Sequence, residues 1–226
     1  MCGRWDIEIT DAEAVARFRI DHVVDRLTPN YNVAPETEMP IIFESEDSKR
    51  VMKAFQWGLK REWWEKGKPD PINARAEGIE SSRMFGPLLK RQRCLVPASG
   101  YYEWVQEGSS KQPYRIRPTD QAAFAFAGLY YSWQRGDDEI ATYTIITTSP
   151  AKSIASIHDR MPVILHPEDE ELWLARDVQE PDAVLPLLRS YESEALEAYK
   201  VDRRVGNSRI NDPGLIEPLP ETRSLF

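Results

Sequence analysis

The hydrophobic pattern of the chain is dominated by short alternating segments. In residues 122–133, AAFAFAGLYYSW, the side chains of Phe124, Phe126 and Tyr130 recur on every second position, which is typical of a strand with one buried face. Other segments rich in β-branched and aromatic residues also predict strands: PIIFES, VMKAFQW, RCLVPAS, YYEWVQ, PYRIRP, IATYTIITT and EALEAYKV. Short turns join many of them, which favours a largely antiparallel sheet.

The helical signals are few and short. Thr10 and Glu13 form a capping box, which predicts a helix over residues 11–19. Further short helices are predicted for SPAKSIASIH, HPEDEELWLA and PDAVLPLL. Residues 60–92 show no clear period, and a segment this long inside a compact domain tends to be functional. The pattern predicts an α+β fold: one domain with a largely antiparallel sheet curled toward a barrel, and peripheral short helices.

Composition sets the class of protein. With 226 residues, 41% of them hydrophobic, the chain can bury a sizeable core without staples. With two cysteines, a disulfide framework is not expected. No Cys or His pair has metal-ligand spacing, and we expect neither a metal nor another cofactor. No stretch approaches the roughly 20 apolar residues of a membrane helix, and the start is polar by residue 4. We therefore expect a cytoplasmic protein with no membrane partner.

Net charge gives a conflicting signal about nucleic acids. The formal charge is −8, whereas phosphate binders usually gain affinity from Lys and Arg. Arginines nevertheless gather in NARAEG, SSRMF and LKRQRC. A basic face on an otherwise acidic protein therefore remains an alternative.

The second residue offers the most specific chemistry. Methionine before a small residue is commonly removed in cells, which would leave Cys2 with a free α-amine beside its thiol. With a reference pKa near 8, roughly 10–17% of such an amine is neutral at pH 7, enough to attack an aldehyde without special tuning. The thiol could then add to the imine and close a five-membered thiazolidine. The alternative is that position 2 is small and has no role.

Four further residues suit catalysis or binding. Asn73 and Arg75 share one face of an extended segment and suit oxygen-rich ligands, although an exposed polar edge explains them equally. Glu103 stands among aromatic residues, which would raise its pKa for acid–base work, although a solvated strand position is the commoner case. His158 lies in SIHDRMPVIL and could titrate near neutral pH or be structural.

An ordered set of motifs carries a family resemblance. These are MCGR, YNVAP, WGL followed by WW, INARAE, SRMF, C-x-x-P with GYYEW, QPY, TTS, IHDRMPVIL and VGN. Together they resemble the SRAP (SOS-response-associated peptidase) family of abasic-site processing proteins. The resemblance runs from residue 2 to about 210, which implies one SRAP-like domain over 1–226 with a C-terminal tail at 211–226.

The resemblance implies a covalent function. Family members recognise an abasic site in single-stranded DNA, commonly near a junction with duplex, and their N-terminal cysteine forms a thiazolidine crosslink that shields the lesion. Carried over, Cys2 supplies amine and thiol, Glu103 shuttles protons, and His158 assists imine formation and lyase-like reversal. Asn73 matches the asparagine that holds the sugar or the Cys2 backbone. Such a protein would work close to DNA, in the nucleoid or, in a eukaryote, the nucleus.

The resemblance also implies a DNA surface. Arg4, Arg75 and Arg160 match arginines near the flanking phosphates. The apolar wedge that stacks on exposed bases is matched by Trp63 or Trp64 with Met84 and Phe85. Stacking is worth about 1–3 kcal/mol per base, which lessens the need for net positive charge. The expected partner is single-stranded DNA containing an abasic site, bound by a monomer.

Two other function classes stay open. A cysteine peptidase or amidohydrolase would use the Cys2 thiolate as nucleophile with His158 or Glu103 as base. A noncovalent single-strand binding module would make Cys2 incidental. Every covalent role for the Cys2 amine requires removal of Met1.

Overall fold

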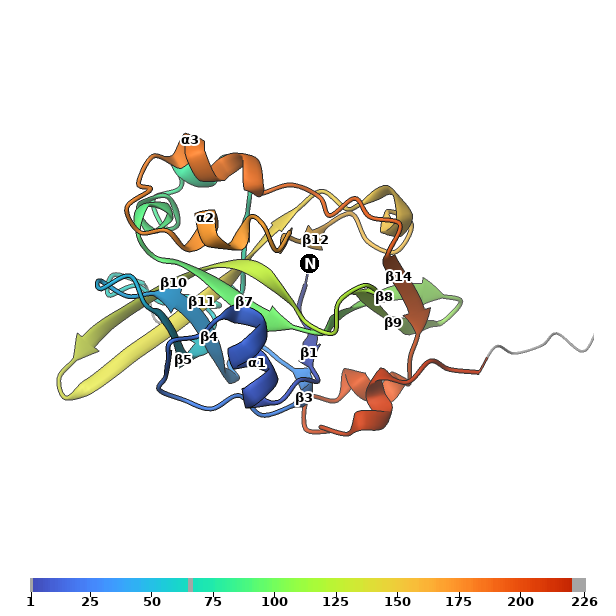
Figure 1. The fold of residues 1–226 in the computed structure, drawn as a ribbon. Helices are drawn as coiled ribbons and strands as arrows, with labels where there is room; N and C mark the ends of the chain where they lie inside the picture. Colours follow the sequence, from blue (N-terminus) through green and yellow to red (C-terminus); the bar gives the residue numbers. More distant parts are fainter. Residues whose placement is uncertain (1, 65–66, 221–226) are drawn as a thin grey trace, which may run out of the picture.

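The computed structural model describes residues 2–64 and 67–220. Within that part of the chain the strands form two sheets (Figure 1). The smaller sheet has the strand order β14 (Leu196–Lys200), β9 (Ser110–Pro118), β8 (Gly100–Glu107), β1 (Trp5–Ile7) and β3 (Asn30–Val33). All its pairings are antiparallel.

The larger sheet closes on itself. Its ring consists of β5 (Arg50–Trp57), β4 (Glu38–Glu44), β7 (Arg93–Ala98), β10 (Phe124–Arg135) and β11 (Asp138–Thr148). Thr142 and Tyr143 of β11 pair in parallel with Gln56 and Trp57 of β5, which completes a five-stranded barrel. Four short strands join it: β2 (His22–Val23), β6 (Asn73–Arg75), β12 (Met161–Pro162) and β13 (Ile164–Leu165). The prediction of an α+β fold with a mostly antiparallel, curled sheet is confirmed.

Three short helices lie outside the sheets. In Figure 1, α2 (Glu170–Leu174) and α3 (Pro181–Val184) lie together above the larger sheet, and α1 (Asp11–Phe18) lies below it. The predicted capping box forms: Glu13 N donates to Thr10 Oγ1, and Thr10 N donates to the Glu13 carboxylate. The α1 prediction is therefore confirmed to within one residue.

The helix predicted for SPAKSIASIH is wrong. The structure has a single 3-10 turn at Lys152–Ile154, and the chain then runs without regular structure to His158. Ile154 is the one buried residue of that turn. PDAVLPLL is helical only at Pro181–Val184 and continues as a 3-10 turn (Leu185–Leu187), because Pro186 has no N–H for an α-helical bond.

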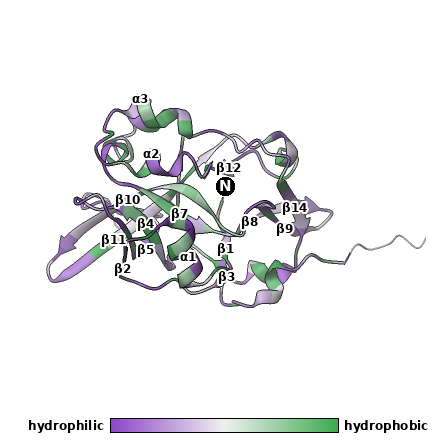
Figure 2. Ribbon diagram, viewed as in Figure 1, coloured by the Kyte–Doolittle hydropathy of each residue, from purple (hydrophilic) through white to green (hydrophobic). Residues whose placement is uncertain are grey.

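One apolar core runs through the barrel and reaches the smaller sheet. Trp5 of β1 meets Trp57 of β5 and Phe126 of β10 edge-on, each with ring centroids 6.4 Å apart. Figure 2 colours β7 and β10 hydrophobic over much of their length. The aromatic side chains therefore join the two sheets into one packed unit around β1.

A smaller cluster of Tyr102, Val201, Val205 and Leu215 packs on the other face of β8. Leu215 belongs to a 3-10 turn at Pro213–Ile216 and is fully buried. The described part of the predicted tail is thus packed as far as this turn, while residues 221–226 lie outside the described residues. The division into a core and a tail stays a prediction.

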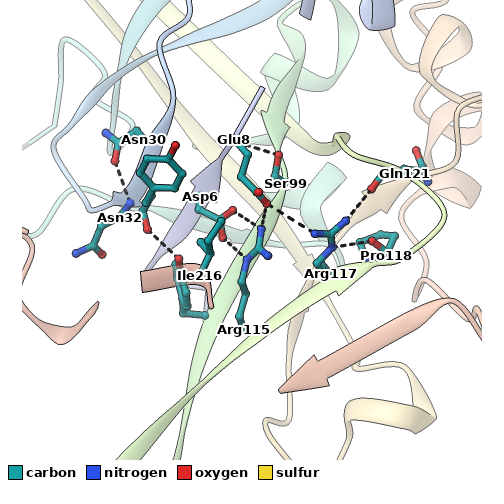
Figure 3. Close-up of polar contacts among 12 residues, drawn as sticks. Asp6, Glu8, Asn30, Asn32, Ser99, Arg115, Arg117, Pro118, Gln121 and Ile216 are labelled. Atoms are coloured by element: carbon teal, nitrogen blue, oxygen red, sulfur yellow. Dashed lines mark hydrogen bonds and ion pairs between the residues drawn. The ribbon is translucent and has the colours of Figure 1, made fainter. Parts of the chain in front are cut away.

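A buried ion pair fixes β1 against β9. Arg115 Nη2 lies 2.7 Å from Asp6 Oδ1, its Nε donates to Asp6 Oδ2 at 3.0 Å, and Glu8 also accepts from it (Figure 3). The pair passes over Gly100, where a Cβ would come within 2.6 Å of Arg115 Nε. Glycine at position 100 is therefore required by packing.

Within residues 2–64 and 67–220, no helix combines the length and apolar character needed to span a membrane.

Candidate active site around Cys2

Cys2 lies where the two sheets meet. Just before β1 begins, the carbonyl of Arg4 accepts a 2.9 Å hydrogen bond from the Tyr102 amide of β8. The carbonyl of Cys2 accepts a 2.8 Å hydrogen bond from Asn73 Nδ2 of β6, which belongs to the larger sheet. The Cys2 side chain is 0% exposed. Both sheets therefore hold the backbone on either side of Cys2.

Burial makes the Cys2 thiol a weak acid. It raises the pKa of the thiol far above its usual range, and the nearby Glu103 carboxylate raises it further. The charge of the terminal amino group lowers this pKa, but burial has the larger effect, so the thiol stays protonated at neutral pH. Any reaction at this sulfur must therefore remove its proton as the new bond forms.

Glu103 is a buried carboxylate in β8. It is 4% exposed, and burial raises its pKa from 4.5 to about 7, with a further contribution from the charge of Asp159. A carboxyl group with this pKa exchanges protons readily at neutral pH. Glu103 is therefore buried with a raised pKa, and does not lie on a solvated face of the strand.

His158 faces Glu103. Its Nε2 lies 3.8 Å from Glu103 Oε2, and its Nδ1 accepts a 2.9 Å hydrogen bond from the Arg160 amide. That bond requires an unprotonated Nδ1, so the neutral ring carries its proton on Nε2, toward Glu103. Burial lowers the pKa of His158, which also favours the neutral ring. Asp159 Oδ1 is 2.9 Å from Nδ1, and its charge raises the pKa of His158, but burial has the larger effect.

Asn73 is positioned by an unexpected strand. β6 pairs in parallel with β11, and Asn73 stands opposite Ile145. Its Nδ2 is used by Cys2, while its Oδ1 is buried with no hydrogen-bond partner among the described residues. The amide can thus hold the Cys2 backbone and still accept one bond from a ligand.

The three predicted arginines have different surroundings. Arg4 is half-buried and its Nη1 donates to Asn32 Oδ1 at 2.8 Å and to the Val205 carbonyl at 3.0 Å. Arg160 makes a two-pronged contact with Glu77, at 2.7 and 2.8 Å. Arg75 is exposed. Two of the arginines thus already have protein partners, and Arg75 presents its guanidinium to solvent.

The predicted apolar residues divide in a similar way. Trp63 is 43% exposed, with Arg83 stacked 4.8 Å from its ring centroid, and Trp64 is half-buried beside it. Phe85 is half-buried, whereas Met84 is only 8% exposed and packs into the core. Trp63 therefore offers the largest flat surface of the four, and Met84 offers little in this conformation.

The structure adds residues that the sequence did not single out. Thr147 accepts a 2.6 Å bond from Arg160 through its carbonyl. Tyr101 and Tyr143 lie buried close enough to Cys2 for its charge to affect them. Tyr101 is two residues before Glu103, and this alternation is the signal that could have identified it. No comparable signal marks Tyr143.

These features define a class of α+β protein with a buried thiol near the chain start, beside a carboxylate and a neutral imidazole. The chain belongs to the family described as SOS response associated peptidase (SRAP), whose model matches residues 1–208. This finding confirms the resemblance inferred from the sequence motifs.

Known relatives cover nearly the whole chain. "Abasic site processing protein YoqW" of Bacillus subtilis is 38% identical over 223 residues, covering 96% of this chain and 99% of that protein. "Abasic site processing protein YedK" of Escherichia coli is 32% identical over 228 residues, covering 97% of this chain and 100% of that protein. A crystal structure of a protein from Bacteroides thetaiotaomicron superposes with a TM-score of 0.86 at 29% identity, covering 97% of this chain and 100% of that one.

Proposed function

We propose that this protein processes abasic sites in single-stranded DNA by forming a covalent thiazolidine crosslink through Cys2. The relatives named as abasic site processing proteins support the substrate. The observation that carries the chemistry is the placement of Cys2, whose backbone is held by Asn73 next to the buried Glu103 and the half-buried His158.

The first step joins the Cys2 amine to the aldehyde at C1′ of the open-chain sugar. The nitrogen lone pair forms the C–N bond, the carbonyl π electrons move to oxygen, and one N–H proton passes to that oxygen, which gives a hydroxyl group. Protonated Glu103 gives its proton to this hydroxyl, which leaves as water, and the product is a protonated imine. A carboxyl pKa of about 7 provides both the acid and the base form at neutral pH.

The second step closes the ring. The Cys2 sulfur bonds to the imine carbon, and the C=N π electrons move to the nitrogen. The thiol proton passes to the carboxylate that Glu103 became in the first step. His158, with Nε2 toward Glu103, shares this proton and assists the reverse reaction and lyase-like strand cleavage.

Met1 must be removed for this chemistry, and it lies outside the described residues. While Met1 is attached, the nitrogen of Cys2 is an amide and cannot form an imine. We therefore propose methionine removal as the activating step.

The DNA surface is proposed from the exposed groups near the site. Arg75 would contact a flanking phosphate directly, whereas Arg4 and Arg160 would do so while keeping their protein partners. Trp63, supported by Trp64, Met84 and Phe85, would stack on an unpaired base. We propose a monomer acting where the single strand meets duplex.

The thiol supports this function over a cysteine peptidase. A peptidase needs a thiolate of lowered pKa before it meets its substrate, but burial raises the pKa of Cys2. In the crosslinking reaction the amine attacks first, and the thiol has only to lose its proton during ring closure. A raised thiol pKa is therefore tolerated.

The experiment mixes the protein with an abasic oligonucleotide and separates the products on a denaturing gel. Wild type is expected to give a heat-stable shifted band, and Cys2→Ala is expected to lose it. Cys94→Ala is the matched control, because Cys94 is the other buried thiol. Peptide cleavage without a shifted band would favour the peptidase. Unchanged DNA retention by Cys2→Ala would favour the noncovalent module.

A further inference from the structure

Two buried tyrosines near Cys2 have hydroxyl groups without hydrogen-bond partners. Tyr101 of β8 and Tyr143 of β11 are both completely buried. Neither hydroxyl has a partner among the described residues. A buried polar group in this state is costly, and in a native protein it calls for an explanation such as a catalytic role or a bound water.

Their strands aim both tyrosines toward the site. Tyr101 and Glu103 are two residues apart on β8, so their side chains share one face of the strand. Tyr143 stands two residues before Ile145 on β11, and Ile145 pairs with Asn73. Cys2, Tyr101 and Tyr143 belong to one packed cluster. The two phenols thus enter, from different sheets, the core that also holds Cys2.

Both phenols remain proton donors at neutral pH. Burial raises the pKa of Tyr101, and the charges of Cys2 and Glu103 raise it further. Burial also raises the pKa of Tyr143, with contributions from Cys94 and Cys2. Each O–H group can therefore donate a hydrogen bond without losing its proton.

We infer that the Tyr101 hydroxyl, with Tyr143 as a second donor, hydrogen-bonds the Cys2 sulfur while the thiazolidine ring closes. This inference rests on the proposed function. In that step the S–C bond forms, the C=N electrons move to nitrogen, and the thiol proton passes to the Glu103 carboxylate. The phenols keep their protons and stabilise the negative charge that develops on sulfur. Fixed donors in a water-excluded site act strongly on such charge.

Loss of either tyrosine hydroxyl is expected to slow ring closure and to leave imine formation unchanged. Tyr101→Phe is expected to slow the appearance of heat-stable crosslink by about 10-fold or more, the effect of losing a hydrogen bond to a charged group. The imine trapped with borohydride is expected to form at the wild-type rate. Tyr143→Phe is expected to have a smaller effect in the same direction.

Folding stability separates catalytic from structural hydroxyls. Because the Tyr101 hydroxyl has no protein partner, Tyr101→Phe should leave the urea midpoint unchanged or raise it. Tyr102→Phe is the matched control, since this neighbouring buried tyrosine donates to the Tyr31 carbonyl at 2.8 Å. That variant should lower the midpoint and leave the rate of ring closure unchanged.

A second readout needs no DNA. The rate of Cys2 alkylation by iodoacetamide, followed by peptide mass against pH, reports the thiol pKa. Tyr101→Phe should shift this profile to higher pH, because the thiolate loses a donor. If wild type forms no crosslink but the profile shifts, the proposed function fails while the contact to sulfur stands. An unchanged profile, with a lowered urea midpoint and normal ring closure, would show a structural hydroxyl and overturn the inference.

Discussion

At the scale of single residues, burial shifts the two central groups of the site in the same direction with different consequences. It raises the pKa of the Cys2 thiol out of the neutral range and that of Glu103 to about 7. The first shift keeps the sulfur protonated until it reacts, and the second makes Glu103 an effective proton carrier.

Glu103→Gln tests this proton carrier. The variant is expected to lower the rate of crosslink formation by about 10²–10⁴-fold, as is usual for loss of a general acid–base. The remaining rate should show no inflection near pH 7. Rates measured between pH 5 and 9 check this, with the exposed Glu38→Gln as control. A retained inflection near pH 7 would assign the proton transfer to another group.

The same variant has a predicted effect on stability. The folded pKa of Glu103 lies above its ordinary value of 4.5, so the folded state holds this proton more tightly than the unfolded state. The wild type therefore loses stability as pH rises from about 4.5 to about 7, and Glu103→Gln escapes this loss. In urea unfolding, the free energy of unfolding of the variant should increase relative to that of wild type as the pH rises from 5 to 8. A gain toward acid pH would contradict the assignment.

Sequence reasoning predicted which residues form the candidate site better than it predicted their contacts. Cys2, Glu103, His158 and Asn73 follow from the family motifs, and the structure brings them together. The partner of Arg160 could not be foreseen, because Glu77 and Arg160 are 83 positions apart in the sequence. Pairing over such distances depends on the closed sheet.

At the scale of secondary structure, β1 is the element that places Cys2. It pairs with β8, and the buried ion pair between Asp6 and Arg115 links it to β9. The sequence predicted α1 from its capping box and β10 from its alternating hydrophobic residues. For β6, the spacing of Asn73 and Arg75 indicated an extended segment, but no local pattern showed that it pairs in parallel with β11.

Arg115→Met should destabilise the protein strongly. It leaves the Asp6 carboxylate buried without its cation, which typically costs about 3–5 kcal/mol. The double variant Asp6→Leu with Arg115→Met should recover most of this loss, because apolar residues of similar size replace buried pairs well. Free energies of unfolding in urea measure both. A single variant as stable as wild type would show that the pair does not hold β1.

At the scale of the whole molecule, two sheets close around one short segment. The barrel is completed by two parallel pairs between β5 and β11, which join residues 86 positions apart. The sequence predicted a curled sheet but could not show this closure. The net charge of −8 also belongs to this scale, since it limits how strongly phosphates can be attracted.

Binding to unmodified single-stranded DNA should depend weakly on salt. Each phosphate contact contributes about 0.7 to the slope of log affinity against log salt. With Arg75 exposed and Arg4 and Arg160 engaged within the protein, we expect a slope of roughly 1–2.

Titrations in a Cys2→Ala background measure this slope reversibly. Arg75→Gln should reduce it by about 0.7. The exposed Arg26 follows β2, which pairs with the beginning of β5, whereas Arg75 belongs to β6, which pairs with β11; Arg26→Gln is therefore the control and should change nothing. Equal slopes for the two variants would show that Arg75 does not contact a phosphate.

The central claim is that Cys2 traps an aldehyde with its own amine and thiol. Intact mass spectrometry of the protein, before and after mixing with an abasic oligonucleotide, tests it most directly. We predict a free protein lighter by one methionine residue, and a heat-stable conjugate whose mass is protein plus oligonucleotide minus one water. A protein that retains Met1 and still forms this conjugate, or one that lacks Met1 and forms none, would contradict the account.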